Sequence, residues 1–357
     1  MKSKKIILFV FIIIFLLVIG IYYFNIFKIQ KDISKLSLDN IQIADNTIIF
    51  NSLTLKQKIG QMIMVRGDKK ELYFNNLNVG GIFLDRQESE KDYRNLILQY
   101  QTDSKIKLLV STDLEGAWTP FHNPEHYQKF PPFSKINTAK EAEEIGIKQG
   151  ELLKKIGFNL NFAPVAEYSD DVYGGRTFIG TDEEISQKVG AYIRGLQINV
   201  LGTCKHYPGN SMEKNLHEVY DEQVISQRDL YLFDVCLENN ISSIMVSHQI
   251  AKGIIESNGK PSTVSKEVVS TIEDNVLIIA DEINMKGLKD FYPEKTKLYI
   301  DLINSGENLI LDFYLDPNQL YKLVEELENE VEKGNIDKQK IDESVKKILK
   351  IKGYKVV

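Results

Sequence analysis

NVLIIAD, residues 275–281, is an apolar run that ends in a carboxylate. A run without polar alternation is typical of a parallel strand that is buried on both faces. Amphipathic stretches separate it from seven similar runs: MIMV (62–65), VGGIFL (79–84), KLLVST (107–112), FNLNFAPV (158–165), GTCKHY (202–207), SSIMVSHQI (242–250) and NLILDF (308–313). Eight such strands over about 300 residues predict an α/β fold, a single-domain (β/α)8 TIM-type barrel.

Stretches with helical periodicity lie between these runs and after the last one. Apolar positions recur at helical spacing over Glu141–Ile156, Glu183–Leu196 and Ile336–Ile351, and each stretch predicts a helix with one buried face. Thr181 precedes the second helix as an N-cap, and Gly157 ends the first.

The N-terminus has the composition of a membrane span. Three lysines in the first five residues precede an apolar run from Ile6 to Phe24. As a helix this run is about 28 Å long, which matches the hydrocarbon thickness of a bilayer. The lysines keep the N-terminus in the cytoplasm, so the chain that follows is expected to be exported. A cleaved signal peptide is the alternative, but no small-x-small cleavage site follows the run.

These features predict three parts. Residues 1–27 are expected to form a transmembrane signal-anchor, residues 28–50 a tether, and residues 51–357 the barrel. The predicted location is the cell membrane, with a single span and an extracytoplasmic catalytic domain. The expected partners are therefore the membrane, through the N-terminal helix, and a substrate for the barrel.

The composition of the 357-residue chain excludes some function classes. Hydrophobic residues make up 43% and charged residues 26%, which is ordinary for a globular protein. The net charge is -6 and no long Lys/Arg block follows the N-terminus, so nucleic acid is not expected as a partner. Cys204 and Cys236 make no disulfide framework, and we expect both to be small buried residues. We expect the chain to act as a monomer.

Ionisable residues gather where the predicted strands end. Because the carboxyl ends of barrel strands meet at one face, these residues predict a site with carboxylates and cations. They are Asp113, Glu115, Glu167, Arg176, Lys205, His206, His248, Asp281, Glu282 and Asp312. The five histidines have no metal-ligand spacing, and no phosphate-binding or serine-nucleophile motif appears, so neither a metal nor a cofactor is expected. The interpretation that remains is a site that uses carboxylates to react with a polar substrate.

At these residues the chain resembles glycoside hydrolase family 3, specifically its single-domain beta-N-acetylhexosaminidase branch. The resemblance covers residues 53 to 353. It is carried in order by LTLKQKIGQMIMV (53–65), STDLEG (111–116), GFNLNFAPVAEYSD (157–170), GRTFIGTDEE (175–184), TCKHYPGN (203–210), PSTVS (261–265) and IIADEINMKGL (278–288).

The resemblance implies a role for each matching residue. Asp281 is implied as the nucleophile of a retaining mechanism that forms a glycosyl-enzyme. The residues implied to bind the substrate sugar are Asp113, Arg176, Lys205, His206 and His248. In this branch the general acid/base is a histidine on the loop after the fifth strand, and His217 matches it.

Two departures from the family pattern lie at the implied substrate. The Asp that normally pairs with the acid/base histidine is Asn215, which can orient an imidazole but not stabilise its charge. Trp118 stands where the family has an Arg-containing segment, and its ring is a candidate platform for a sugar face.

The resulting hypothesis is an exo-acting, retaining glycosidase. Its expected substrate is a carbohydrate, with terminal beta-N-acetylhexosamine of cell-wall or extracellular glycans as the specific candidate. The Asn215 departure leaves a catalytically weak or inactive glycan-binding barrel as the alternative. Phosphorolysis in place of hydrolysis is a third hypothesis, because a neutral histidine does not repel phosphate.

Overall fold

Eight parallel strands form a closed barrel in the computed structural model, which describes residues 14–20, 40–67, 77–121, 127–169, 174–210 and 221–357. Around the barrel the strand order is β3, β4, β5, β6, β7, β9, β11 and β12, and β12 pairs with β3 to close it. The strands are β3 (Ile63–Arg66), β4 (Gly81–Phe83), β5 (Leu109–Thr112), β6 (Leu160–Asn161), β7 (Leu201–Tyr207), β9 (Ser243–Val246), β11 (Leu277–Ala280) and β12 (Leu309–Asp312). Each lies within, or within one residue of, one of the eight apolar runs, so the predicted barrel is confirmed.

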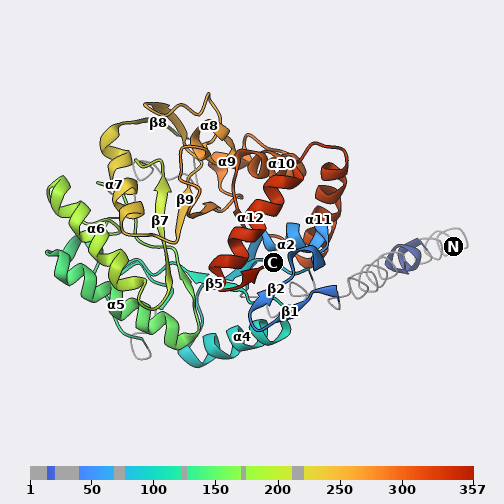
Figure 1. The fold of residues 1–357 in the computed structure, drawn as a ribbon, viewed down its shortest axis with the longest axis horizontal. Helices are drawn as coiled ribbons and strands as arrows, with labels where there is room; N and C mark the ends of the chain where they lie inside the picture. Colours follow the sequence, from blue (N-terminus) through green and yellow to red (C-terminus); the bar gives the residue numbers. More distant parts are fainter. Residues whose placement is uncertain (1–13, 21–39, 68–76, 122–126, 170–173, 211–220) are drawn as a thin grey trace, which may run out of the picture. The chain divides into compact units, whose positions relative to one another are not determined.

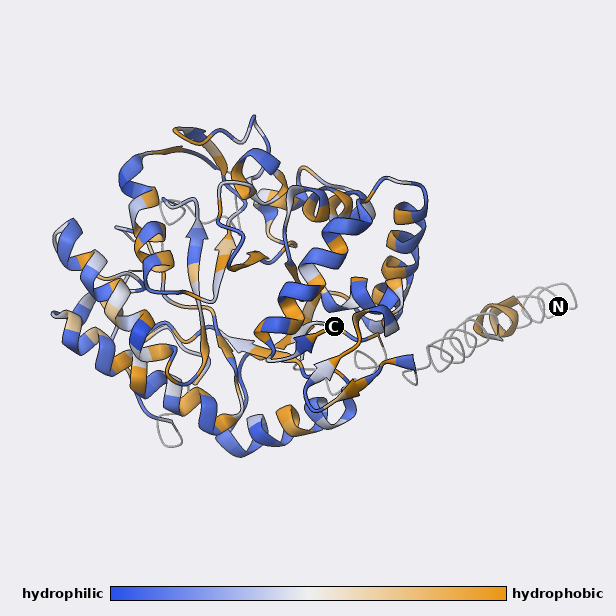
Figure 2. Cartoon of the chain, in the orientation of Figure 1, coloured by the Kyte–Doolittle hydropathy of each residue, from blue (hydrophilic) through white to orange (hydrophobic). Residues whose placement is uncertain are grey.

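Helices cover the outside of the barrel (Figure 1). They are α2 (Leu55–Gln61), α4 (Glu90–Asp103), α5 (Ala139–Ile156), α6 (Asp182–Leu196), α7 (Gln227–Glu238), α8 (Lys266–Val269), α9 (Lys286–Lys289), α10 (Lys295–Ser305), α11 (Pro317–Glu332) and α12 (Lys338–Ile351). The three helices predicted from periodicity are α5, α6 and α12. Apolar and polar residues alternate along them in Figure 2, as one-sided burial requires.

Local sequence explains where these helices begin and end. Thr54, Thr138 and Thr181 form capping boxes at the starts of α2, α5 and α6, in which side chain and backbone satisfy each other's donors. Gly157 ends α5 with a φ of 116°. This left-handed backbone conformation is energetically unfavourable for residues that carry a Cβ, so glycine is favoured at this position.

A short sheet lies outside the barrel and involves part of the predicted tether. Strands β1 (Ile43–Ala44) and β2 (Thr47–Ile48) pair antiparallel, and β2 pairs in parallel with β13 (Lys355–Val356). Ile41 and Phe50 beside them are buried. The compact unit therefore extends over 41–357, and the boundary lies about ten residues before the expected one because these apolar side chains are covered by folded chain. A second small sheet pairs β8 (Glu222–Ile225) with β10 (Ile250–Gly253) in parallel.

The predicted membrane location requires correction. No helix among the described residues has both the length and the apolar character that crossing a bilayer demands. Within the predicted span, residues 14–20 are helical, and its other residues lie outside the described part of the chain. The single-pass, extracytoplasmic assignment is therefore withdrawn.

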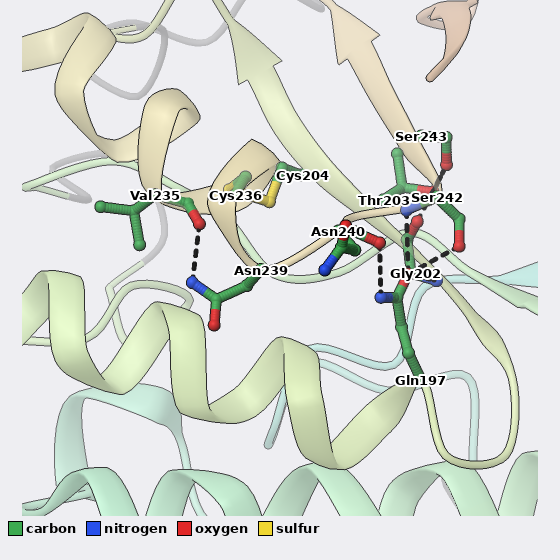
Figure 3. The surroundings of a disulfide bond; sticks show 10 residues. All are labelled: Gln197, Gly202, Thr203, Cys204, Val235, Cys236, Asn239, Asn240, Ser242 and Ser243. Carbon is green, nitrogen blue, oxygen red and sulfur yellow. Dashed lines mark hydrogen bonds between the residues drawn. A yellow bond between two sulfur atoms is a disulfide. The ribbon is translucent and has the colours of Figure 1, made fainter. Parts of the chain in front are cut away.

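The two cysteines form a disulfide between β7 and α7 (Figure 3). Both are fully buried, as expected for small apolar residues, but their pairing was not expected. Cys204 and Cys236 are 32 residues apart in sequence, and they meet because a helix packs onto the strand that precedes it in a βαβ unit.

Candidate active site

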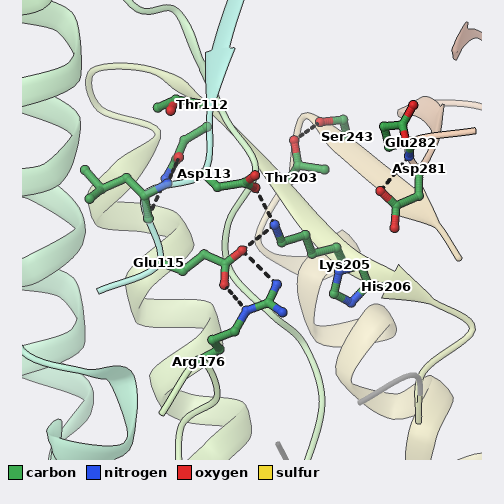
Figure 4. Close-up of polar contacts among 12 residues, drawn as sticks. Thr112, Asp113, Glu115, Arg176, Thr203, Lys205, His206, Ser243, Asp281 and Glu282 are labelled. Carbon is green, nitrogen blue, oxygen red and sulfur yellow. Dashed lines mark hydrogen bonds and ion pairs between the residues drawn. The ribbon is translucent and has the colours of Figure 1, made fainter. Parts of the chain in front are cut away.

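The predicted site residues lie where barrel strands end. Asp113 follows β5, and Lys205 and His206 belong to the last part of β7. His248 follows β9, and Asp281 follows β11. Parallel strands place these ends on one face, and Figure 4 shows Asp113, Lys205, His206 and Asp281 in one close-up.

Asp281 is half-buried, and its Oδ1 accepts a hydrogen bond of 2.7 Å from the backbone N–H of Glu282. Burial raises the pKa of Asp281, but the charges of His206, His248 and Lys205 and the hydrogen bond from the Glu282 N–H together outweigh it. The net effect lowers its pKa, so the carboxylate is ionised at neutral pH. An ionised carboxylate that solvent can reach is available to react.

Lys205 joins two carboxylates. Its Nζ lies 2.6 Å from Oδ1 of Asp113 and also pairs with Oε1 of Glu115. Lys205 is buried, whereas the Asp113 side chain is 33% exposed. Burial lowers the pKa of Lys205, but the two carboxylates overcome this effect and raise it, so the ammonium stays charged.

Glu115 is the buried centre of this cluster. It has no exposed surface, and Arg176 binds it with both Nε and Nη2, the latter at 3.0 Å from Oε1. Burial raises the pKa of Glu115, but Arg176 and Lys205 more than reverse this and lower it to about 2. Arg176 therefore binds the Glu115 carboxylate of the protein itself. Its planar guanidinium, with two donors side by side, suits this structural role.

Glu115 was not among the predicted substrate-binding residues, although its place two residues after Asp113 at a strand end was visible in the sequence. A buried carboxylate needs partners, and only the fold shows that Lys205 and Arg176 supply them.

His206 is oriented by Glu167. The Nδ1 atom of His206 lies 3.0 Å from Oε1 of Glu167, and the His206 backbone N–H donates to the same oxygen at 3.2 Å. The peptide bond between Lys205 and His206 is cis. A carboxylate on Nδ1 fixes the ring and leaves Nε2 as the atom directed elsewhere.

His248 uses both ring nitrogens inside the protein. Nε2 lies 2.9 Å from the carbonyl oxygen of Glu282, and Nδ1 lies 3.0 Å from the hydroxyl of Thr263. Since a carbonyl can only accept, Nε2 carries the hydrogen. His248 is fully buried, and its hydrogen bond to the Glu282 carbonyl holds the backbone next to Asp281.

Trp118 borders a cavity of about 460 Å³ that also reaches Asp113. A tight turn presents the ring: the backbones of Glu115 and Trp118 exchange hydrogen bonds of 2.8 and 3.1 Å, and Gly116 between them has a φ of 64°. A Cβ at Gly116 would lie 2.5 Å from the carbonyl oxygen of Pro131, so glycine is required. The cavity is lined by Phe83, Asp85, Arg86, Thr112, Asp113, Ala117, Trp118, Thr119 and Pro120.

Trp118 is 48% exposed, and the guanidinium of Arg176 lies 5.6 Å from the centroid of its ring. His217 and Asn215 lie outside the described residues. Across the described ranges, no group of three or more His, Cys, Asp or Glu side chains is arranged to hold a metal ion.

This barrel, with an ionised aspartate and a lysine–carboxylate cluster at its strand ends, has the architecture of a glycosidase that works through carboxylates. The family model described as the glycosyl hydrolase family 3 N terminal domain matches residues 54–351. The chain therefore belongs to glycosyl hydrolase family 3, and the resemblance found in its motifs is confirmed.

Similar proteins agree with this family. Beta-hexosaminidase LpqI of Mycobacterium tuberculosis is 20% identical over 334 residues, which cover 84% of this chain and 83% of the relative. A family 3 beta-N-acetylglucosaminidase from Paenibacillus has a similar structure, with a TM-score of 0.76, 24% identity and coverage of 84% of this chain and 62% of that one. The beta-glucoside phosphorylase BglX superposes with a TM-score of 0.73 at 21% identity, over 85% of this chain and 58% of that one. At these identities the solved structures show the fold.

Proposed function

We propose that this chain is an exo-acting, retaining glycoside hydrolase that releases terminal beta-N-acetylhexosamine, with Asp281 as its nucleophile. The observation that carries the proposal is the ionised, half-buried carboxylate of Asp281 at the strand ends, beside a lysine that binds two further carboxylates. The relative named beta-hexosaminidase and the similar beta-N-acetylglucosaminidase support the choice of sugar.

The geometry suggests which oxygen of Asp281 attacks. Oδ1 is occupied by the Glu282 N–H, and within the described residues Oδ2 accepts no hydrogen bond. In the first step Oδ2 bonds to the anomeric carbon while the glycosidic C–O bond breaks and the leaving oxygen takes a proton. In the second step water attacks the same carbon and gives a proton to the acid/base group, which has lost its own to the leaving oxygen, while the bond between the carbon and Oδ2 breaks and releases the carboxylate.

The substrate sugar would be held by groups on the opposite side of the site. The exposed part of Asp113 accepts sugar hydroxyls, and Lys205 orients that carboxylate. Burial raises the pKa of Asp113, and the charge of Lys205 opposes this rise. His206, which Glu167 orients, is proposed to contact another hydroxyl of the sugar. The half-exposed ring of Trp118 provides a flat apolar surface for a pyranose face beyond Asp113.

The acid/base role remains assigned from the family motif alone. We propose His217 for it, because it matches the loop histidine of this branch and a proton donor must reach the leaving oxygen. We propose that the chain works as a monomer, and light scattering on the purified protein tests that point.

Turnover of nitrophenyl beta-glycosides tests the function. Wild type is expected to release nitrophenol from the N-acetylglucosamine derivative, a 2-fluoro glycoside is expected to label Asp281, and Asp281→Asn is expected to lose turnover. The exposed Asp290 provides the matched control Asp290→Asn, which should behave as wild type. No release from any sugar, with no labelling, overturns the proposal. Products that require phosphate would replace hydrolysis with phosphorolysis.

A further inference from the structure

The peptide group of Glu282 lies between two residues of the site. Its N–H donates to Oδ1 of Asp281 at 2.7 Å, and its carbonyl oxygen accepts from Nε2 of His248 at 2.9 Å. The orientation of this peptide therefore determines which oxygen of Asp281 is occupied and which one can face a sugar. Figure 4 shows the side chains of Asp281 and Glu282 pointing in different directions from the strand end.

The Glu282 side chain ties this peptide to the neighbouring strand. Its Oε1 accepts from Nδ2 of Asn284 at 2.6 Å and from the backbone N–H of Phe313 at 3.4 Å. The same Asn284 nitrogen also donates to Oδ1 of Asp312 at 3.0 Å. One amide group thus connects the residue after the nucleophile to the carboxylate that ends β12.

Asp312 anchors the network in the barrel wall. It is fully buried, and both its oxygens bind Nζ of Lys295, at 3.1 and 2.9 Å. The hydroxyl of Tyr299 donates to Oδ2 at 3.1 Å. Lys295 and Tyr299 belong to α10, so a helix and a strand hold the far end of the network, and the lysine balances the buried charge.

We propose that Glu282 is a positioning residue for Asp281: through Asn284 and Asp312 it fixes the 281–282 peptide, so that Oδ1 stays occupied and Oδ2 faces the anomeric carbon. This inference rests on the proposed function. A nucleophile that is misplaced by about 1 Å can lose on the order of 100-fold in rate, so a residue that never contacts the sugar can control turnover.

The charge of Glu282 predicts a measurable pH dependence for this positioning role. Burial, with the neighbouring charge of Asp312, raises its pKa to about 7, although the hydrogen bonds from Asn284 and Phe313 oppose the shift. As an anion Glu282 makes stronger hydrogen bonds to these two donors than it does when protonated. Turnover should therefore increase as the pH rises through about 7. The other titratable groups around it are Asp281, His248, Lys295, Tyr299 and Asp312.

Kinetics of three variants on nitrophenyl N-acetyl-beta-glucosaminide test the proposal. Glu282→Ala removes the acceptor, and kcat should fall on the order of 10- to 100-fold with KM little changed. Glu282→Gln keeps an acceptor oxygen without the charge, so it should retain part of kcat and lose the rise in activity near neutral pH. The matched control is Glu294→Ala, because Glu294 is exposed and caps α10 without a side-chain hydrogen bond.

The outcomes separate the two proposals. If wild type turns over and Glu282→Ala keeps the wild-type kcat, the positioning role is overturned while the hydrolase remains. If Glu282→Ala fails to fold, the pH profile of Glu282→Gln decides, and an unchanged profile overturns the role. If wild type releases nothing from any glycoside, the proposed function fails, and this inference fails with it.

Discussion

Nζ of Lys205 lies 2.6 Å from Oδ1 of Asp113, and the two residues come from the ends of different barrel strands, 92 positions apart in sequence. The same ammonium also reaches Glu115, which Arg176 holds from the other side. One lysine therefore links the partly exposed carboxylate of Asp113 to the buried ion pair of Glu115 and Arg176. This arrangement makes sugar binding and local stability depend on the same side chain.

Replacement of Lys205 by Met should affect both properties. The change leaves Asp113 without its cation and Glu115 with Arg176 alone. Breaking a buried ion pair by removing one partner typically costs about 3–5 kcal/mol. We expect a lower melting temperature by circular dichroism and a loss of kcat/KM of at least about 100-fold. Lys205→Arg, which keeps the charge, should recover part of both. Wild-type kcat/KM in Lys205→Met would contradict the role given to this cluster.

Truncation of Trp118 should weaken substrate binding and leave the fold intact. The ring is half-exposed and borders the cavity that contains Asp113, so little packing is lost. Stacking is worth about 0.5–1.5 kcal/mol, so Trp118→Ala should raise KM about 2- to 10-fold, and Trp118→Phe should stay near wild type. Steady-state kinetics and a thermal melt measure the two effects. An unchanged KM in Trp118→Ala would remove the ring from the substrate site.

Removal of the disulfide should lower stability without affecting the site directly. Cys204 and Cys236 are 32 residues apart, and closing a loop of that size in the unfolded chain is worth roughly 3–4 kcal/mol. We expect the Cys204→Ser/Cys236→Ser variant to unfold at a lower urea concentration than wild type. Thiol titration of the denatured wild-type protein should find no free thiol, and two thiols per chain would show that the bond is not formed.

Much of the fold could be predicted from local sequence. Eight apolar runs became eight barrel strands, since a strand that is buried on both faces cannot tolerate polar alternation. Thr181 was recognisable as an N-cap because its role depends on neighbours within one turn. The family motifs located Asp113, Lys205 and Asp281, which all lie at strand ends.

Features that depend on distant partners could not be predicted. Glu115 and Glu167 are defined by the cations and imidazole that the fold places beside them, and nothing in their local sequence specifies these partners. His248 matched a substrate-lining residue, yet both its nitrogens bond within the protein. Ile48 was assigned to a tether, because the strand that pairs with its own comes from the C-terminus of the chain.

Glu307 is a buried carboxyl that the site does not use. It lies just before β12, at the end of the strand opposite Asp312, and it is fully buried. Within the described residues neither of its carboxyl oxygens has a hydrogen-bond partner. Burial raises the pKa of Glu307 well above its usual value, so the folded protein binds a proton there that the unfolded chain has released.

Glu307→Gln should therefore stabilise the protein at high pH and have little effect at low pH. A carboxyl whose pKa is raised by folding contributes its stability below the unfolded pKa, near 4.5, and this contribution is lost as the pH rises toward the folded pKa. Relative to Glu307→Gln, wild type should lose up to about 1.4 kcal/mol per pH unit in that window. Urea unfolding at pH 5 and pH 8 measures the difference, and the exposed Glu332 provides the control Glu332→Gln. Because both proteins share every other titrating group, the difference between them isolates Glu307. A stability difference that does not change with pH would mean that Glu307 is ionised in the folded state, with a partner that neutralises it.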